Sequence, residues 1–390
     1  MKPVLAINGG SSSIKFALFD VTQMTRVRWG KIERAGSEAA TLTHSNSATG
    51  REETLALPSE SDAGDYLVDW IDRQTFAADI TAIGHRVVHG GEKLNAPHVI
   101  DDPLLAELRR ITPYDPDHLP AEIRLIERFR AHFPSVPQVA CFDTAFHKDM
   151  PPVAKTIAIP RRYQAKGIRR YGFHGLSYAY LMQELERVAG AQVAAGRVIL
   201  AHLGSGASMA AVHHQRSVDT SMAFTPAAGL MMSTRSGDVD PGLVSFLARS
   251  EGMSAAQFDH MVNHDSGLLG VSETASDMRI LLAREREDHR AAEAVSLFCH
   301  QVKRWIGAYA AVLGGLDTLV FAGGIGENAA PVRARICEGL EFLGVDLDEA
   351  RNAAHASVIS SDASRVTVHV IRTDEELMIA RSVFRVLDSL

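Results

Sequence analysis

The chain has 390 residues, of which 46% are hydrophobic and 22% are charged, and its formal net charge is -7. This composition is typical of a globular protein with two domains or one large one, and it argues against disorder. The acidic balance disfavours nucleic acid and anionic membranes as main partners, while a locally basic site can still bind a small anion.

The cysteines and the hydropathy pattern indicate a compartment. Cys141, Cys299 and Cys337 lie far apart and form no C-x-x-C pair, which disfavours a disulfide framework or a zinc site and favours a reducing environment. The sequence shows no secretory leader and no apolar run of membrane-spanning length. We therefore expect a cytoplasmic protein without a membrane partner.

The first expected element is a strand, a turn and a second strand. Residues 4–7 form a short apolar run, and Ile14, Phe16 and Leu18 alternate with their neighbours. The turn between them, N-G-G-S-S-S, does not match the P-loop, which reads G-x-x-x-x-G-K-[ST] and opens a helix. Its backbone N–H groups and serine hydroxyls can bind an anion, but a plain tight hairpin remains the alternative. The polar residues 34–65 are expected to form a variable surface excursion.

Further elements follow in both halves of the chain. Asp102 and Pro103 indicate the start of a helix, with Asp102 as N-cap. Residues 198–203 lead through G-S-G-A-S into residues 209–212, which predicts a second hairpin with a small-residue tip. Two hairpins of one design, one in each half, indicate a duplicated α/β architecture.

The last third of the chain is predicted to be mainly helical. Residues 291–313 have helical spacing, and the strand 318–322 enters G-G-I-G-E-N before a helix from about Pro331 to Leu343. Thr373 and Glu376 have the spacing of a capping box at the start of a C-terminal helix.

Four segments concentrate charged or imidazole side chains, three of them beside glycine. They read G-H-R-V-V-H-G-G (84–91), C-F-D-T-A-F-H (141–147), R-Y-G-F-H-G (170–175) and T-R-S-G-D-V-D-P (234–241). A single His or Arg is more often structural. Glycine removes side-chain bulk where a ligand can approach, so the set together favours a binding site.

These segments resemble the acetate kinase family in order and spacing, from residue 4 to about residue 382. N-G-G-S-S-S-I-K, H-L-G-S-G-A-S, D-T-S-M-A-F-T-P, A-S-D-M-R, G-G-I-G-E-N and T-D-E-E-L-M-I-A-R complete the match. The resemblance implies the fold of the acetate and sugar kinase, Hsp70 and actin superfamily. That fold is α/β, with duplicated actin-like (ribonuclease H-like) βββαβαβα domains and a nucleotide cleft between them. We expect residues 1–147 together with 376–390 to form one domain and residues 148–375 to form the adenosine-binding domain.

The resemblance also implies an activity. It is the reversible, direct in-line transfer of the γ-phosphoryl group of ATP to acetate or propionate, giving an acyl phosphate and ADP. Mg²⁺, with Mn²⁺ as an alternative, is the implied cofactor, and a homodimer is the implied assembly.

The chemistry of this transfer suits the charged residues. A carboxylate acceptor is already ionised at neutral pH and needs no general base. The obstacle is repulsion between two anions, so the site must supply positive charge and alignment. By resemblance, Arg86 and Arg235 bind the carboxylate and the phosphoryl group, and His174 stabilises the transition state. Asp143 lies near the metal or orients the acceptor.

The resemblance assigns the remaining site residues to three groups. The metal ligands are Asn8 and Glu375. The acceptor pocket is formed, beside Arg86, by Val88, His118, Phe173 and Pro226. The nucleotide-binding residues are Ser11, Ser13, Lys15, His202, Leu203, Gly204, Ser205, Gly206, Asp277, Met278, Arg279, Gly323, Gly324, Ile325, Gly326 and Asn328.

Two departures from the family pattern bear on the acceptor. The family reads L-H-N-P-A-N-L near residue 118, whereas this chain reads D-H-L-P-A-E-I, and Ser205 stands where asparagine is common. Asp117 would repel a carboxylate or recognise an added polar group. A kinase for a hydroxylated acceptor, with Asp143 as base, and a nucleotide-binding module without turnover are the alternatives. The paired arginines disfavour both.

Overall fold

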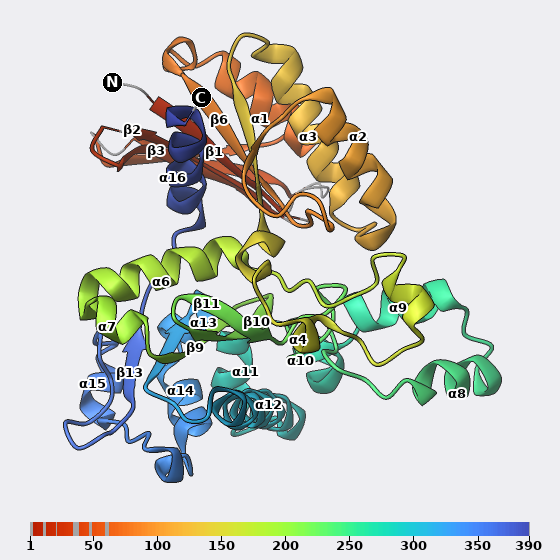
Figure 1. The fold of residues 1–390 in the computed structure, drawn as a ribbon, viewed down its shortest axis with the longest axis vertical. Coiled ribbons are helices and arrows are strands. Elements are labelled where there is room, and N and C mark those ends of the chain that lie inside the picture. Colours follow the sequence, from red (N-terminus) through yellow and green to blue (C-terminus); the bar gives the residue numbers. More distant parts are fainter. Residues whose placement is uncertain are drawn as a thin grey trace. The chain divides into compact units, whose positions relative to one another are not determined.

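The computed structural model describes residues 3–10, 13–20, 22–33, 39–46, 49–58 and 62–389, apart from the Asn46 side chain. The chain divides into two compact units (Figure 1). Unit 1 comprises Met1–Phe146, Gly175–Tyr180 and Asp374–Leu390, and unit 2 comprises His147–His174 and Leu181–Thr373.

Unit 1 is built on an eight-stranded sheet with the order β5-β4-β3-β2-β1-β6-β8-β7. Strand β1 pairs antiparallel with β2 and parallel with β6, which is in turn parallel to β8. The strands are β1 Pro3–Gly9, β2 Ser13–Asp20, β3 Thr25–Glu33, β4 Thr41–Asn46, β5 Arg51–Ala56, β6 Ala82–Val87, β7 His98–Val99 and β8 Gln138–Phe142. The helices are α1 Ala63–Asp72, α2 Asp102–Ile111, α3 Leu119–His132 and α16 Glu375–Asp388, with 3₁₀ turns η1 Ala77–Asp79, η2 Thr112–Tyr114 and η3 Asp143–His147.

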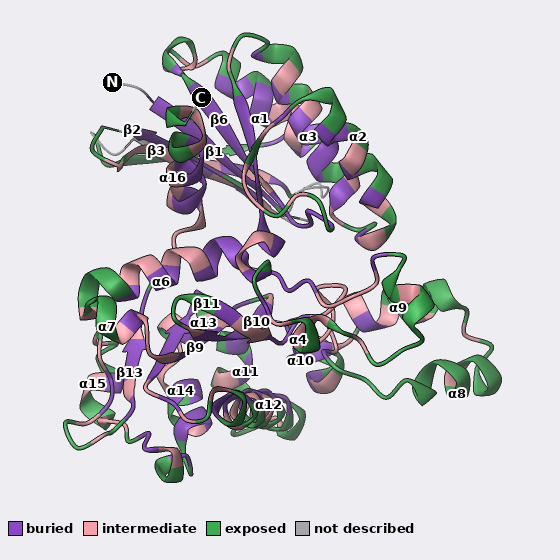
Figure 2. Ribbon diagram, in the orientation of Figure 1, coloured by how far each residue is buried: buried purple, intermediate pink, exposed green. Residues whose placement is uncertain are grey.

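Alternation along β1 explains why this sheet has helices on both faces (Figures 1 and 2). Successive side chains of a strand point to opposite faces. Leu5 and Ile7 therefore join the core under α1 and α3, while Val4 and Ala6 join the core under α16. Gly84 in β6 lets α16 pack closely, because a Cβ atom there would lie 2.4 Å from the Ile379 side chain.

Unit 2 contains a five-stranded sheet with the order β11-β10-β9-β12-β13. Its strands are β9 Arg197–Leu203, β10 Ala207–His213, β11 Arg216–Thr220, β12 Thr318–Ala322 and β13 Thr367–Val370. The helices are α4 Pro152–Lys155, α5 Arg161–Gln164, α6 Gly175–Ala189 (whose first turns belong to unit 1), α7 Ala191–Ala194, α8 Gly242–Ser250, α9 Ala255–His264, α10 Gly267–Ser272, α11 Met278–Arg284, α12 His289–Leu313, α13 Gly323–Asn328, α14 Ala330–Cys337 and α15 Glu349–Ala353, with the 3₁₀ turn η4 Glu341–Leu343.

The two sheets repeat one arrangement, which confirms the predicted duplication. In unit 1, β1 forms an antiparallel hairpin with β2, and on its other side the strands β6 and β8 run parallel to β1. In unit 2, β9 forms an antiparallel hairpin with β10, and on its other side the strands β12 and β13 run parallel to β9. Each hairpin tip thus lies at the end of the sheet where the parallel strands finish.

Several local predictions were wrong. Residues 41–46 and 51–56, predicted as part of a surface excursion, form β4 and β5 and extend the sheet. Helix α2 is capped by Asp101, one residue before the expected cap. The G-G-I-G-E-N segment is itself helix α13, and α14 ends at Cys337 because Gly339 follows in a left-handed conformation (φ +76).

The predicted capping box at the start of α16 is also wrong. Asp374, not Thr373, is the N-cap, and its carboxylate accepts a hydrogen bond from the Leu377 backbone N–H. Glu376 is therefore not engaged in capping. Among the described residues, no helix combines the length and apolar character that a membrane crossing requires.

Candidate functional site

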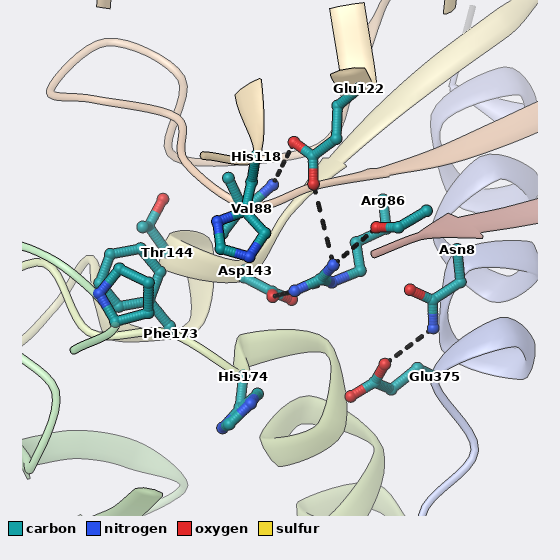
Figure 3. A network of polar contacts seen from close by, with 12 residues as sticks. Asn8, Arg86, Val88, His118, Glu122, Asp143, Thr144, Phe173, His174 and Glu375 are labelled. Carbon is teal, nitrogen blue, oxygen red and sulfur yellow. Dashed lines mark hydrogen bonds and ion pairs between the residues drawn. The ribbon is translucent and has the colours of Figure 1, made fainter. Parts of the chain in front are cut away.

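The carboxyl ends of β1, β6 and β8 bring the predicted charged residues of unit 1 together (Figure 3). Asn8 lies near the end of β1, Arg86 near the end of β6, and Asp143 directly after β8. Glu375 is the first residue of α16, which packs against β1 and β6. In open α/β sheets the carboxyl ends of the strands are the usual place for a ligand.

Arg86 is held on several sides. Its Nε and Nη2 donate to Asp143 Oδ2 at 2.9 and 2.7 Å, and its Nη1 donates to the Gly9 carbonyl at 2.9 Å. Burial alone would lower the pKa of Arg86, but the charges of Asp143, Glu122 and Glu375 raise it above its ordinary value. The guanidinium is therefore fixed in position and permanently charged.

Asp143 is a buried carboxylate with one committed oxygen. Burial raises its pKa above the ordinary value, the charge of Arg86 opposes that rise, and the charge of Glu375 adds to it. Oδ2 receives both hydrogen bonds from Arg86, whereas the buried Oδ1 has no hydrogen-bond partner in the described part of the chain. An unsatisfied buried acceptor of this kind is rare in native proteins unless a ligand or water completes it.

Asn8 connects the end of β1 to the start of α16. Its Nδ2 donates to Glu375 Oε2 at 2.8 Å and to Glu376 Oε1 at 2.9 Å. Burial is the main cause that raises the pKa of Glu376. The charge of Lys15 on β2 opposes this effect and that of Glu375 adds to it. The side-chain amide of Asn8 thus bonds two adjacent glutamates.

The oxygen ligands at Asn8 and Glu375 fit Mg²⁺ better than they fit a metal ion that takes all of its ligands from the protein. The described residues contain no group of three or more His, Cys, Asp or Glu side chains arranged to hold a metal. Mg²⁺ usually takes one or two carboxylates and completes its shell with water and substrate phosphates. A carboxylate and an amide oxygen are hard ligands of the required kind.

A second set of predicted residues gathers in unit 2 around Gly206. His174 Nδ1 is hydrogen-bonded to Ser208 Oγ at 2.9 Å, and its ring stacks on that of His202 with centroids 4.4 Å apart. A Cβ atom on Gly206 would lie 3.2 Å from His174 Nε2 and 3.9 Å from Arg235 Nη2. The glycine therefore leaves room beside the imidazole and the guanidinium at the same point.

The loop that carries Arg235 is tied to the hairpin tip. Arg235 Nη1 donates to the Pro226 carbonyl at 3.0 Å, and the Ser233 N–H donates to the Ser205 carbonyl at 3.1 Å. Ser205 itself is exposed. The structure thus brings Arg235 and Pro226 to the tip that the sequence assigned to phosphate binding.

His147 is a supporting residue to which the sequence alone gives no role. Its Nε2–H donates to the Phe173 carbonyl at 3.1 Å, and Ser217 Oγ lies 2.8 Å from Nδ1. Burial lowers its pKa to about 4, so the ring is neutral. His147 thus fixes Phe173, the residue before His174. The backbone of His174 is left-handed (φ 57). The place of His147 in F-D-T-A-F-H was the only signal in the sequence.

The remaining tip residues lie where β9 and β12 end. Leu203 is buried at the end of β9, and Gly204 lies near the Gly324 backbone N–H. Gly323 has φ +76, and a Cβ there would lie 2.7 Å from the Leu203 carbonyl oxygen. Glu327, a residue that sequence reasoning missed, accepts hydrogen bonds from the backbone N–H groups of Gly323 and Thr373.

Several other nucleotide-site predictions are less closely grouped. Asp277 and Arg279 pair with one another at 2.6 Å on the surface, where Asp277 caps α11. Met278 is in the core and Ile325 is half-buried. The Gly326 carbonyl accepts a hydrogen bond from Arg333, and Asn328 donates one to the Gly324 carbonyl. Ser13 begins β2, Lys15 is exposed on the same strand, and Ser11 lies outside the described residues.

Comparison with known proteins identifies the chain. The sequence pattern of the Acetokinase family matches residues 3–381. The chain belongs to this family.

The relatives of this chain include acetate kinases and propionate kinases. The chain is 45% identical to an acetate kinase of Rhodopseudomonas palustris, over 99% of this chain and 98% of the relative. It is 43% identical to a propionate kinase of Citrobacter rodentium, over 98% of this chain and 96% of the relative. Among solved structures, acetate kinase of Porphyromonas gingivalis (36% identity, TM-score 0.89) and a propionate kinase of Francisella tularensis (35%, TM-score 0.92) each cover 99% of this chain and match over 100% of their own.

The residues predicted for the acceptor pocket can each be placed in the structure. Val88 and Phe173 are buried, and His118 Nδ1 lies 2.8 Å from Asp115 Oδ1. The Val88 N–H donates to Glu122 Oε2 at 2.9 Å. Glu122 was not assigned from the sequence. Only its departure from the family pattern pointed to it.

Proposed function

We propose that this protein transfers the γ-phosphoryl group of ATP reversibly to acetate or propionate, by direct in-line transfer. The observation that carries the proposal is Arg86, which is held charged and in place by Asp143 and Gly9. An anionic acceptor needs such a positive group and no base. The matching acetate and propionate kinases support the same acceptor class.

The residues have separable roles in this proposal. Arg86 binds the acceptor carboxylate, since a guanidinium meets a carboxylate in a planar, paired geometry. Arg235 and His174 Nε2, both beside Gly206, bind the phosphoryl oxygens as charge shifts during transfer. Val88, His118, Phe173 and Pro226 surround the acyl group. The paired arginines suit an anionic acceptor, and they disfavour a hydroxylated acceptor that would need Asp143 as base.

Other residues hold the metal and the nucleotide in this proposal. Mg²⁺, held by Glu375 and Asn8 with Asp143 nearby, would neutralise charge on the ATP phosphates when bound. The two glycine-rich tips, with Ser11, Ser13, Lys15 and His202, would bind those phosphates. Asp277, Arg279 and the Gly323–Asn328 helix would contact the adenosine. We take the two compact units to be the predicted domains.

An acyl phosphate trap tests the function. Hydroxylamine converts acyl phosphates to coloured hydroxamates, so ATP, Mg²⁺ and each of formate, acetate, propionate, butyrate and several hydroxy acids are offered in turn. We expect acetate and propionate to give the strongest signals and the Arg235→Ala variant to give almost none. If no acid yields hydroxamate, the carboxylate kinase proposal fails.

We further propose that the protein is a cytoplasmic homodimer in which α8 faces a second copy. Leu243, Val244 and Phe246 on this helix are 39%, 42% and 56% exposed. The three cysteines are buried free thiols, which fits a reducing compartment.

Light scattering on a sizing column checks the assembly. The Phe246→Lys variant is expected to run as a monomer, because a charge replaces the most exposed of these apolar side chains. Ser245→Lys is the control and should remain a dimer, because helical periodicity places Ser245 on the side of α8 away from the middle of this apolar face. A dimer in the Phe246→Lys variant would contradict the α8 interface.

A further inference from the structure

Glu122 is a buried carboxyl group beside Arg86 whose role the proposed function leaves open. It lies in the first turn of α3 and is only 5% exposed. Oε2 accepts the Val88 N–H at 2.9 Å, whereas Oε1 makes no hydrogen bond in the described part of the chain. The nearest cation to Oε1 is Arg86 Nη1, at 3.8 Å (Figure 3). One oxygen is thus anchored and the other faces the guanidinium without bonding it.

Glu122 also lines a cavity. It has a volume of about 330 Å³, and its wall includes Gly9, His118, Glu122 and Leu125. A space of that size has room for about ten water molecules. The carboxyl group can therefore exchange a proton with solvent although it is buried, and a change in its charge acts directly on Arg86.

The donor inventory of Arg86 makes Glu122 a competitor of the acceptor. Nε, one N–H of Nη2 and one N–H of Nη1 are already used on Asp143 and Gly9. A guanidinium with these bonds has one donor left on each terminal nitrogen, and a carboxylate bound in paired geometry uses both. An ionised Glu122 attracts the remaining Nη1 donor and repels an incoming carboxylate.

We propose that Glu122 sets the affinity of Arg86 for the acceptor carboxylate, weakening it when ionised and releasing Nη1 when protonated. The inference rests on the proposed function, since it needs an anionic acceptor at Arg86. The proton balance is simple: the acid binds as its carboxylate, and Glu122 holds a proton taken from solvent. Glu122 is a positioning residue, because it acts through Arg86.

The titration of Glu122 falls in a useful range. Burial raises its pKa from 4.5 to about 7, while the charges of Arg86 and His118 and the Val88 N–H oppose the rise, and Asp115 adds to it. Other charged residues surround the pair: Asp143 and Glu375 act on Arg86, and the cavity is lined by Asp62, Asp65, Asp117, Arg124 and Arg128.

The first test separates KM from kcat as a function of pH. In the wild type, KM for the acid should rise by about tenfold between pH 6 and pH 8, as expected when only the protonated form leaves Arg86 open. Glu122→Gln keeps an oxygen for the Val88 N–H but cannot ionise, so its KM should stay low and nearly constant. KM for ATP should show no such dependence.

Glu127→Gln is the matched control, because it is the same change on the same helix at an exposed position paired with Arg109. It should reproduce the wild-type pH profile. The inference is overturned if Glu122→Gln keeps the wild-type slope of KM, or if it lowers kcat and leaves KM unchanged.

A second readout does not depend on turnover. Because the folded-state pKa is raised, between about pH 4.5 and pH 7 the unfolded chain ionises Glu122 while the folded chain keeps it protonated, so the wild type loses stability across this window. The Tm of Glu122→Gln minus that of the wild type should therefore increase from pH 5 to pH 7 and then level off. A constant difference would overturn the inference. If no acid yields hydroxamate but the Tm difference follows the expected trend, only the proposed function is refuted.

Discussion

The Arg86→Ala variant is expected to lower kcat/KM for the acceptor acid by about 10³-fold, comparable with the loss of an arginine that neutralises phosphoryl-transfer charge. Arg86 is a cation held in place in unit 1 by hydrogen bonds to Asp143 and Gly9. Its removal leaves a buried, uncompensated Asp143 and no partner for the acceptor carboxylate. Steady-state kinetics with saturating ATP measure the effect.

Binding of ATP should survive this change, which calorimetry on the variant can check. Arg235→Ala is expected to show a loss of the same order, because Arg235 supplies the charge beside Gly206. Arg130→Ala, at an ion pair on the surface of α3, is the control and should keep the wild-type rate. Near-normal turnover in either active-site variant would contradict the roles assigned to the two arginines.

Removal of Mg²⁺ by excess chelator is expected to abolish turnover, and added Mg²⁺ should restore it. Glu375→Gln should raise the Mg²⁺ concentration for half-maximal rate by at least about tenfold, because it replaces a charged oxygen ligand with a neutral one. Asn8 would then donate to a neutral group, so local geometry would persist while affinity falls. Rates titrated against Mg²⁺ measure this shift.

Glu349→Gln offers a matched comparison, since Glu349 is likewise the first residue of a helix but is exposed. Its Mg²⁺ dependence should equal that of the wild type. Full activity in excess chelator would refute the metal role of Glu375, and so would an unchanged Mg²⁺ requirement in the Glu375→Gln variant.

The parts of the fold that were predictable are those with a local pattern. The apolar run of β1 and the alternation in β2 gave the first hairpin, and the same logic gave β9 and β10. Strand β5 escaped prediction because its side chains are all exposed, so no apolar face marks it. The cap of α16 was misassigned because Asp374 and Thr373 are both good cap residues, and only backbone geometry selects between them.

Site residues were predictable where a family segment contained them, and not where tertiary packing created the role. Arg86 and Asp143 stand in such segments, and the parallel pairing of β6 and β8 brings them together. Glu122 lies on a helix that reads as an ordinary amphipathic surface element. Only the packing of α3 against β6 turns it toward Arg86.

Strand β5 has a consequence for solubility. It is one of the two edge strands of the eight-stranded sheet and reads R-E-E-T-L-A, with an ion pair between Arg51 and Glu53 at 3.2 Å. The free edge of a sheet is a template on which a strand of another molecule can add. Charged side chains along that edge would have to lose water for such a strand to dock. The strand that extends the sheet therefore also protects it from growing into aggregates.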